Sequence, residues 1–163
     1  MQTDFLCGAI IKIEVQMEKR EGKILTSDRE IKEVLETAQT IAVVGLSPKP
    51  ERDSHKVAKY MQESGYTIIP VRPAQKEILG ERAYKTLDQV PGPVDIVDLF
   101  RKSEDVMPHV DEAISVGCRL FWMQSGIVNQ EAAKRLTDHG IDVVMDRCIK
   151  VDHASYFKKN ILV

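Results

Sequence analysis

A short polar loop near residue 50 carries side chains that are well suited to binding a phosphate. It follows an apolar run and begins at Gly45, which permits a tight turn and a close approach of the backbone to a ligand. Ser47, Lys49 and Arg52 add a hydroxyl group and two cations. Ser54 is placed to cap a helix whose free amides and positive dipole end would attract a phosphate. An ordinary strand-to-helix connection with solvated charges is the alternative that this loop alone leaves open.

The loop matches neither of two common nucleotide-binding motifs. Only the first glycine of GxGxxG is present, and GxxxxGK[ST] is absent. The next predicted strand ends in Val71, Arg72 and Pro73, without the carboxylate that usually contacts the ribose of NAD. An arginine can pair with a phosphate on the ribose instead, which indicates NADP or the 3′-phosphorylated ADP of coenzyme A. A solvated surface charge is the other interpretation of Arg72.

Polar side chains also follow three later strands. Phe100 and Arg101 offer a ring and a cation that could flank an adenine or a phosphate, although Phe100 could equally close the core. Gln124 and Ser125 offer an amide and a hydroxyl to a polar ligand tail, or they form a loop before a capped helix. Cys148 follows the fifth strand and is either a reactive thiol near a ligand or an inert cysteine.

No group of side chains predicts catalysis or a metal centre. None of the histidines has a neighbouring base, nucleophile and orienting carboxylate, and His55 is expected on a helix surface. Asp95 and Asp98 stand three positions apart in one strand, so they point to opposite faces and form no acid–base pair. The three cysteines are irregularly spaced without a CxxC pair, which favours reduced thiols in a cytoplasmic protein.

Strands and helices alternate over residues 40–146, and this alternation positions the polar loops. Strands are expected at 41–45, 67–71, 94–100, 119–123 and 141–145, and helices at 27–38, 54–64, 86–90, 103–116 and 129–139. Ser27 with Glu30 predicts a capping box, and Asn129 predicts a second helix cap. The pattern therefore predicts an α/β fold with a five-stranded, mainly parallel sheet and helices on both faces. Ligands bind at the carboxyl ends of such strands.

Length and composition exclude several classes of protein. The chain has 163 residues, a net charge of −2 and 43% hydrophobic residues, which fits one globular domain and argues against disorder or nucleic-acid binding. No apolar run is long enough to span a membrane. Residues 1–26 are expected to be an extension before a single domain at 27–163. Within the extension, segment 9–15 could be an edge strand or a frayed tail, and Met17 could be the natural start. Residues 1–15 make a poor signal peptide.

Six short motifs occur in order along the chain: VVGLS (43–47), RDS (52–54), IPVRP (69–73), PVDIVD (93–98), WMQSG (122–126) and VMDRC (144–148). Together they resemble the small stand-alone CoA-binding proteins, which are similar to the N-terminal domain of the succinyl-CoA synthetase alpha subunit. The resemblance spans about residues 28–157. It implies a Rossmann-like domain that holds coenzyme A across the strand ends.

The resemblance also implies where each part of coenzyme A would lie. Phosphates would contact the first loop and the helix behind it, the nucleotide would border the second strand, and the pantetheine arm would meet the fourth. The residues it assigns to cofactor binding are Gly45, Leu46, Ser47, Arg52, Ser54, Val71, Arg72, Pro73, Phe100, Arg101, Met123, Gln124 and Ser125. The chain departs from the synthetase in its longer, proline-bearing first loop, and Gln75 and Lys76 stand near the position of a synthetase lysine.

These observations predict a protein that binds coenzyme A or an acyl-CoA as a stand-alone domain, with no catalysis of its own evident. The synthetase carries its phosphorylated histidine in a second domain that this chain lacks room to form. One alternative is an NADP-dependent reductase with Arg72 on the 2′-phosphate, against which the missing glycines argue. Another is a ligase component that works only with a separate catalytic partner.

Overall fold

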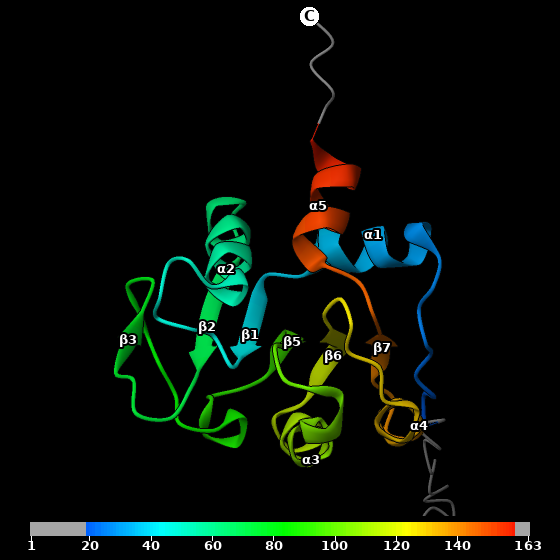
Figure 1. Cartoon of the computed structure of the whole chain (residues 1–163). Helices are drawn as coiled ribbons and strands as arrows, with labels where there is room; N and C mark the ends of the chain where they lie inside the picture. Colours follow the sequence, from blue (N-terminus) through cyan, green and yellow to red (C-terminus); the bar gives the residue numbers. More distant parts are fainter. Residues whose placement is uncertain (1–18, 159–163) are drawn as a thin grey trace, which may run out of the picture.

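Apolar runs of three to six residues form the strands of the central sheet, because helices cover both of its faces. The protein is described here by a computed structural model over residues 19–158. Its sheet has the order β2–β1–β5–β6–β7, and every neighbouring pair is parallel (Figure 1). The strands are β1 Thr40–Val44, β2 Thr67–Val71, β5 Val94–Leu99, β6 Cys118–Met123 and β7 Asp142–Val144. The predicted Rossmann-like α/β sheet is therefore confirmed.

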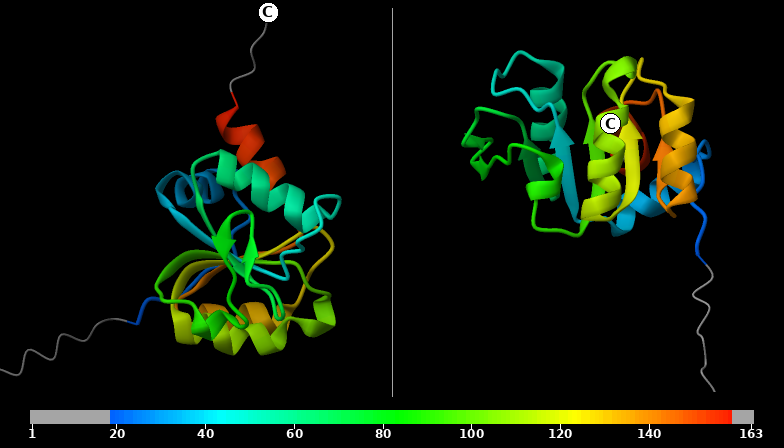
Figure 2. Two further views of the ribbon diagram at one scale, coloured as in Figure 1. Left: turned by 90° about the vertical axis from the view of Figure 1, so that its left-hand side faces the viewer. Right: turned by 90° about the horizontal axis from the view of Figure 1, so that it is seen from below.

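The helices form one layer on each face of the sheet (Figure 2). Helices α1 (Asp28–Thr37), α2 (Asp53–Glu63) and α5 (Ile149–Phe157) cover one face, where Val43, Ile96 and Trp122 belong to the core. The other face carries the turn η1 (Leu87–Gln89) and helices α3 (Met107–Val116) and α4 (Gln130–Asp138). Both layers are apolar inside, which explains why the strands read as continuous hydrophobic runs.

The strand order changes direction between β1 and β5. After β1 the chain crosses to β2 on one side, and it then returns past β1 to build β5, β6 and β7 on the other side. The connection that leaves β1 leads to α2 on one face, whereas the connection that leaves β5 leads to α3 on the opposite face. In doubly wound sheets, such a switch point leaves a crevice at the carboxyl ends of the strands.

Of the helix caps predicted at Ser27 and Asn129, the structure contains one. Asn129 caps α4, since its Oδ1 accepts a hydrogen bond of 2.9 Å from the Ala132 amide. Ser27 stands at the cap position of α1, but its side chain makes no capping hydrogen bond. The Glu30 carboxylate lies 3.9 Å from Lys23 Nζ instead. The predicted capping box is therefore wrong, although the helix begins where it was expected.

The structure contains three elements that the sequence patterns did not predict. Helix α5 follows β7, and the strands β3 (Glu77–Ile78) and β4 (Glu81–Arg82) form a small antiparallel hairpin after β2. The helix expected over 103–116 is divided into a turn, η2 (Ser103–Asp105), and α3. Of the expected extension, only residues 19–26 are described, and Ile24 runs parallel to Val143 at the edge of β7. The possible strand at 9–15 lies outside the described residues.

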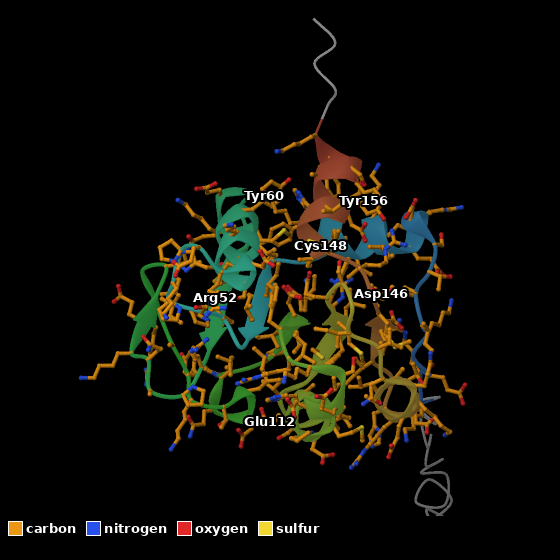
Figure 3. The ribbon with its side chains drawn as sticks, viewed as in Figure 1. Arg52, Tyr60, Glu112, Asp146, Cys148 and Tyr156 are labelled. Atoms are coloured by element: carbon orange, nitrogen blue, oxygen red, sulfur yellow. The ribbon has the colours of Figure 1, made fainter. Side chains whose placement is uncertain are left out.

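Arg147 joins three elements at one end of the sheet. Its guanidinium forms ion pairs of 2.6 Å with Asp28 of α1 and 2.7 Å with Asp152 of α5. Its backbone oxygen accepts a hydrogen bond of 2.7 Å from Nε1 of the buried Trp122. Tyr156 of α5 completes this cluster, because its hydroxyl donates to the same Asp28 carboxylate (Figure 3). Helix α5 is therefore held in place by polar bonds to its neighbours as well as by packing.

Gly45 lies where β1 and β5 separate, and its conformation requires glycine. Its φ is +82°, and a Cβ at this position would stand 2.6 Å from the Phe100 carbonyl oxygen. The backbone is fixed on both sides, since the Gly45 amide donates to Val71 and the Phe100 amide donates to Val44, both at 3.0 Å. A side chain here would therefore push the ends of two central strands apart.

We predict that Gly45→Ala lowers the free energy of unfolding by about 3 kcal/mol, since it combines backbone strain with a clash against a backbone oxygen. The control is Gly126→Ala, because Gly126 has a φ of +83° but no atom within 4 Å of its added Cβ. That variant should lose only about 1 kcal/mol. Urea unfolding of both variants measures the difference, and equal losses would contradict the role of the close approach.

Candidate functional site

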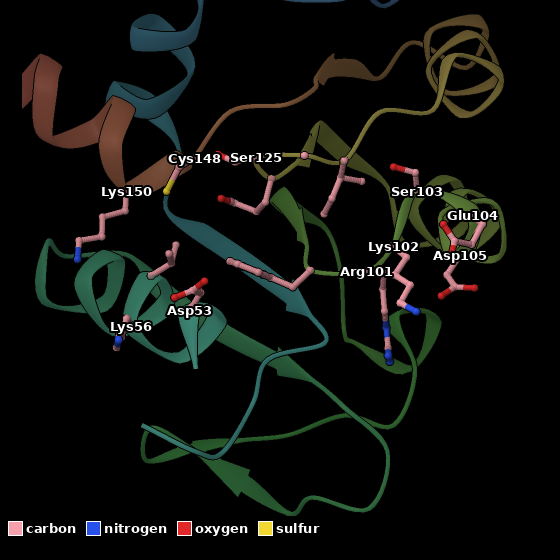
Figure 4. A pocket seen from close by; sticks show the side chains of 15 residues that line it. Asp53, Lys56, Arg101, Lys102, Ser103, Glu104, Asp105, Ser125, Cys148 and Lys150 are labelled. Atoms are coloured by element: carbon pink, nitrogen blue, oxygen red, sulfur yellow. The ribbon is translucent and has the colours of Figure 1, made fainter. Parts of the chain in front are cut away.

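A cleft of about 860 Å³ opens at the carboxyl ends of β5 and β6, beside the switch point of the sheet (Figure 4). The start of α2 and the start of α5 border it on one face, and the β5–α3 connection with η2 borders it on the other. Its lining residues are Asp53, Lys56, Val57, Phe100, Arg101, Lys102, Ser103, Glu104, Asp105, Gln124, Ser125, Gly126, Ile127, Cys148 and Lys150. Its volume is typical of small-molecule sites.

The structure brings four of the predicted cofactor-binding residues together in this lining: Phe100, Arg101, Gln124 and Ser125. Gly45 lies at its border, since a Cβ on Gly45 would stand 3.5 Å from Arg101 Nε. Arg101 therefore connects the ends of β1 and β5 across the switch point. Cys148 lines the cleft as well, at the N-cap position of α5.

Two serine hydroxyl groups hold the loop after β1, one from Ser47 in the loop and one from Ser54 in the first turn of α2. The Ser54 hydroxyl accepts a hydrogen bond of 3.0 Å from the Ser47 amide, and the Ser47 hydroxyl accepts one of 3.2 Å from the Lys49 amide. The Ser47 carbonyl lies 2.9 Å from His55 Nδ1. Helix α2 begins at Asp53 with Arg52 at its N-cap, so Ser54 does not cap the helix as expected. The Ser54 hydroxyl instead accepts the hydrogen bond from the Ser47 amide, because the loop turns back at Ser47 over the first turn of α2.

The remaining predicted residues lie outside the cleft lining. The side chains of Leu46, Val71 and Met123 are buried in the core. Arg72 is half-buried at the end of β2 with Nη1 3.4 Å from the Leu46 carbonyl oxygen. Pro73 and Arg52 are exposed. Whether these residues and the two serines contact a cofactor stays a prediction from the sequence.

Charged groups of both signs surround the cleft. Lys56 and Lys150 stand on one side, and Arg101 and Lys102 stand on the opposite side, with Asp53, Glu104 and Asp105 near them (Figure 4). Lys56, Lys102 and Lys150 are not among the site residues predicted from the sequence. Lys150 could not be placed without α5, whereas Lys56 was detectable because it lies one turn after Arg52 on a predicted helix. Four cations against three carboxylates favour an anionic ligand.

A buried carboxyl group lies under the cleft floor. Asp98 of β5 is 1% exposed, and its Oδ1 accepts a hydrogen bond of 2.5 Å from Nε2 of Gln124, a residue that is 4% exposed. Burial raises the pKa of Asp98 to about 7, while the bond from Gln124 opposes part of that rise. Within residues 19–158 no cation forms an ion pair with Asp98. Burial therefore keeps this carboxyl group protonated to a higher pH than an exposed aspartate.

The histidines lie apart from the cleft lining. His153 packs between Tyr60, Tyr66 and Phe157, and burial lowers its pKa. His109 Nδ1 is 3.5 Å from Glu112 of the same helix. Over the described part of the chain, no group of three histidines, cysteines or carboxylates is placed to hold a metal ion. A search of the same residues for an apolar helix long enough to cross a membrane found none.

Comparison with known proteins adds three findings. The model of a family described as "CoA binding domain" matches residues 39–154. The uncharacterised protein YneT of Bacillus subtilis is 48% identical over 128 residues, which cover 78% of this chain and 95% of YneT. The crystal structure of Prb, a PH1109 protein redesigned for binding, is 33% identical with a TM-score of 0.81, covering 86% of this chain and 99% of that one.

A shorter match relates part of the chain to an enzyme subunit. The alpha subunit of an ADP-forming acetate–CoA ligase (type II) from Pyrococcus furiosus is 37% identical over 57 residues. The match covers 34% of this chain and 12% of the ligase subunit. The common segment is therefore a small part of that larger protein.

We predict that the ionisation of Asp98 opposes folding. The folded pKa of about 7 exceeds the ordinary value of 3.8, so the stabilising contribution is complete below pH 4 and is lost as the pH rises through 7. Asp98→Asn removes the charge and should raise the free energy of unfolding at pH 8 by on the order of 2–4 kcal/mol, with little gain at pH 5.

Urea unfolding at the two pH values tests this. Asp95→Asn serves as the control for charge removal, because Asp95 lies on the same strand and accepts hydrogen bonds from the Gln39 and Thr40 amides away from the cleft. An equal effect of Asp98→Asn at both pH values would contradict the prediction.

Proposed function

This chain belongs to the CoA-binding domain family, and from that premise we propose that it binds coenzyme A or an acyl-CoA in the cleft beside β5 and β6. The observation that carries the proposal is the placement of the cleft at the switch point, with cations from two faces of the sheet around it. Coenzyme A, when bound, supplies a thiol that carries acyl groups as thioesters. The protein acts as a stand-alone binding domain.

The charged part of coenzyme A is suited to the α2 side of the cleft. Its phosphates would meet Lys56 and the positive end of α2. The guanidinium of Arg101, which can bind two phosphate oxygens at once, would reach them from the opposite side of the cleft. Asp53 in the first turn of α2 lowers the local attraction for an anion. The cations on the opposite side of the cleft offset that effect.

The neutral part of coenzyme A is suited to the β6 side. The lining there is formed by Gln124, Ser125, Gly126 and Ile127, with Cys148 facing them from α5. This wall offers an amide, a hydroxyl and backbone groups but no charge. A pantetheine arm with its two amides fits such a wall, in agreement with the sequence-based assignment of Gln124 and Ser125.

A second candidate function is a component of an acyl-CoA ligase that requires another subunit. The match to the ligase alpha subunit favours it. In that case the bound thioester would be presented to catalytic residues of a partner protein. The stand-alone role has the stronger support, because YneT has nearly the same length as the matched region.

We predict micromolar binding of coenzyme A, on the order of −8 kcal/mol, in a calorimetric titration. Dephospho-CoA should bind more weakly because it lacks the 3′-phosphate, and NAD should not bind. Saturable binding of NADP without any response to coenzyme A would contradict the proposal and favour a reductase.

We predict that Arg101→Ala weakens the binding of coenzyme A by about 1.5–3 kcal/mol, because a charged hydrogen-bond donor to a phosphate is lost. Arg82→Ala is the matched control, since Arg82 is exposed on β4 and lies over the Tyr84 ring at 5.1 Å, outside the cleft lining. Arg52→Ala in the same titration tests the phosphate role predicted from the sequence. Unchanged affinity in the Arg101 variant would remove Arg101 from the site.

A further inference from the structure

Asp98 and Gln124 form a buried polar pair between the sheet and the cleft. Asp98 lies opposite Trp122 in the β5–β6 register, and Gln124 follows two residues later at the end of β6. Within residues 19–158, the hydrogen bond from Nε2 to Asp98 Oδ1 is the only one that the Gln124 side chain makes. The Gln124 carboxamide is therefore oriented by Asp98.

The chemistry of the two groups decides which atom of Gln124 points to the cleft. An ionised carboxylate only accepts hydrogen bonds, so the amide nitrogen must face Asp98. The amide oxygen then points away from Asp98. It is not a buried atom, because the only buried side-chain nitrogen or oxygen without a partner in the described residues is His109 Nδ1. Since Gln124 lines the cleft, its oxygen is a free acceptor in the cleft wall.

Burying the Asp98 carboxylate to hold the Gln124 amide costs folding free energy. No ion pair compensates Asp98 within the described residues, and burial disfavours its charged form. A neutral side chain of the same size would fill the space without that penalty. Costly polar groups beneath a cleft are typical of sites that need a defined orientation rather than stability.

We propose that Asp98 is a positioning residue, whose carboxylate fixes the Gln124 carboxamide with its oxygen toward the cleft so that the site accepts an amide N–H from the ligand. This inference rests on the proposed binding of coenzyme A. The donor it selects is an amide of the pantetheine arm, because the wall around Gln124 is uncharged. The nucleotide part of the ligand lies on the cationic side and does not use this acceptor.

Protonation of Asp98 reverses the polarity of the wall. The protonated carboxyl group can donate to the Gln124 oxygen, and the rotated amide then presents its N–H₂ group to the cleft. A ligand N–H meets a donor instead of an acceptor, so the affinity for the arm falls as the pH decreases through about 7. Gln124 has no proton to gain or lose in this range, so the effect originates at Asp98.

Other ionisable groups face the same cleft and must be separated from this effect. The carboxylates are Asp53 of α2 and Glu104 and Asp105 of η2. The cations are Lys56 of α2, Arg101 and Lys102 after β5, and Lys150 of α5, and the thiol is Cys148. Adenosine 3′,5′-bisphosphate meets these cations but lacks the arm. The ratio of the two dissociation constants, coenzyme A over the bisphosphate, therefore isolates the arm.

The experiment is a calorimetric titration of the full chain and its variants with both ligands at pH 6 and pH 8. At pH 8, Asp98→Val, which leaves no acceptor for Gln124 Nε2, and Gln124→Met should each weaken coenzyme A about tenfold, which corresponds to one lost hydrogen bond, and leave the bisphosphate unchanged. The 5′-phosphate of the bisphosphate itself gains a proton near pH 6, so the comparison is made between proteins: from pH 8 to pH 6 the ratio should rise more in the wild-type protein than in either variant. Asp95→Asn, on the opposite face of β5, should behave like the wild type.

Four results would overturn the inference. One is an unchanged ratio in both variants, and another is an equal loss of affinity for the two ligands. The third is the same pH dependence in Gln124→Met as in the wild type. Wild-type protein that binds the bisphosphate and coenzyme A with equal affinity would also exclude a contact to the arm. Failure of the wild type to bind either ligand would instead refute the proposed function itself, and Gln124→Met keeps the test available if Asp98→Val does not fold.

Discussion

No side chain fits between the carboxyl ends of β1 and β5, because the Gly45 backbone lies against the Phe100 carbonyl oxygen. This close approach keeps the two central strands paired up to the point where their connections leave for opposite faces of the sheet. Helix α2 and the turn η2 are thereby held apart on the two faces, and the cleft opens between them. The position of Arg101 beside Gly45 follows from the same geometry, so the candidate phosphate contact of Arg101 depends on the conformation of this glycine.

The face of the sheet below α2 and α5 combines an apolar core with one polar pair. Trp122, Ile96 and Val43 are fully buried there, yet Asp98 stands among them with only Gln124 as its partner. Packing alone would favour an apolar residue at position 98. Asp98 thus lowers the stability of the sheet where its strands end at the cleft. This cost agrees with a requirement for a fixed orientation of the Gln124 carboxamide.

The regular part of the fold was predictable because its signals are local. The buried strands appear as apolar runs, Asn129 caps α4, and Pro70 lies in β2, which is an edge strand. Helix α5 was missed because its sequence has no clear apolar stripe: Val151 is 62% exposed, and the helix is held by Arg147 through contacts distant in sequence. The polarity of the Gln124 wall could not be predicted either, since it depends on Asp98 in a neighbouring strand. Strand ends therefore indicated the region of the site, and tertiary contacts decided which side chains line it.

The ion pairs of Arg147 make the cleft depend on a helix outside the region shared with the family. Cys148 at the N-cap and Lys150 in the first turn of α5 line the cleft, and α5 is tied through Arg147 to Asp28 of α1. The family match begins at residue 39, after α1 has ended. A recombinant fragment trimmed to the matched bounds would retain every strand but lose Asp28, the partner of Arg147, together with the last residues of α5. The arrangement of this domain thus depends on residues outside its region of detectable kinship, and truncation at the amino end would remove both the pairing of residues 23–25 with β7 and the anchor of α5.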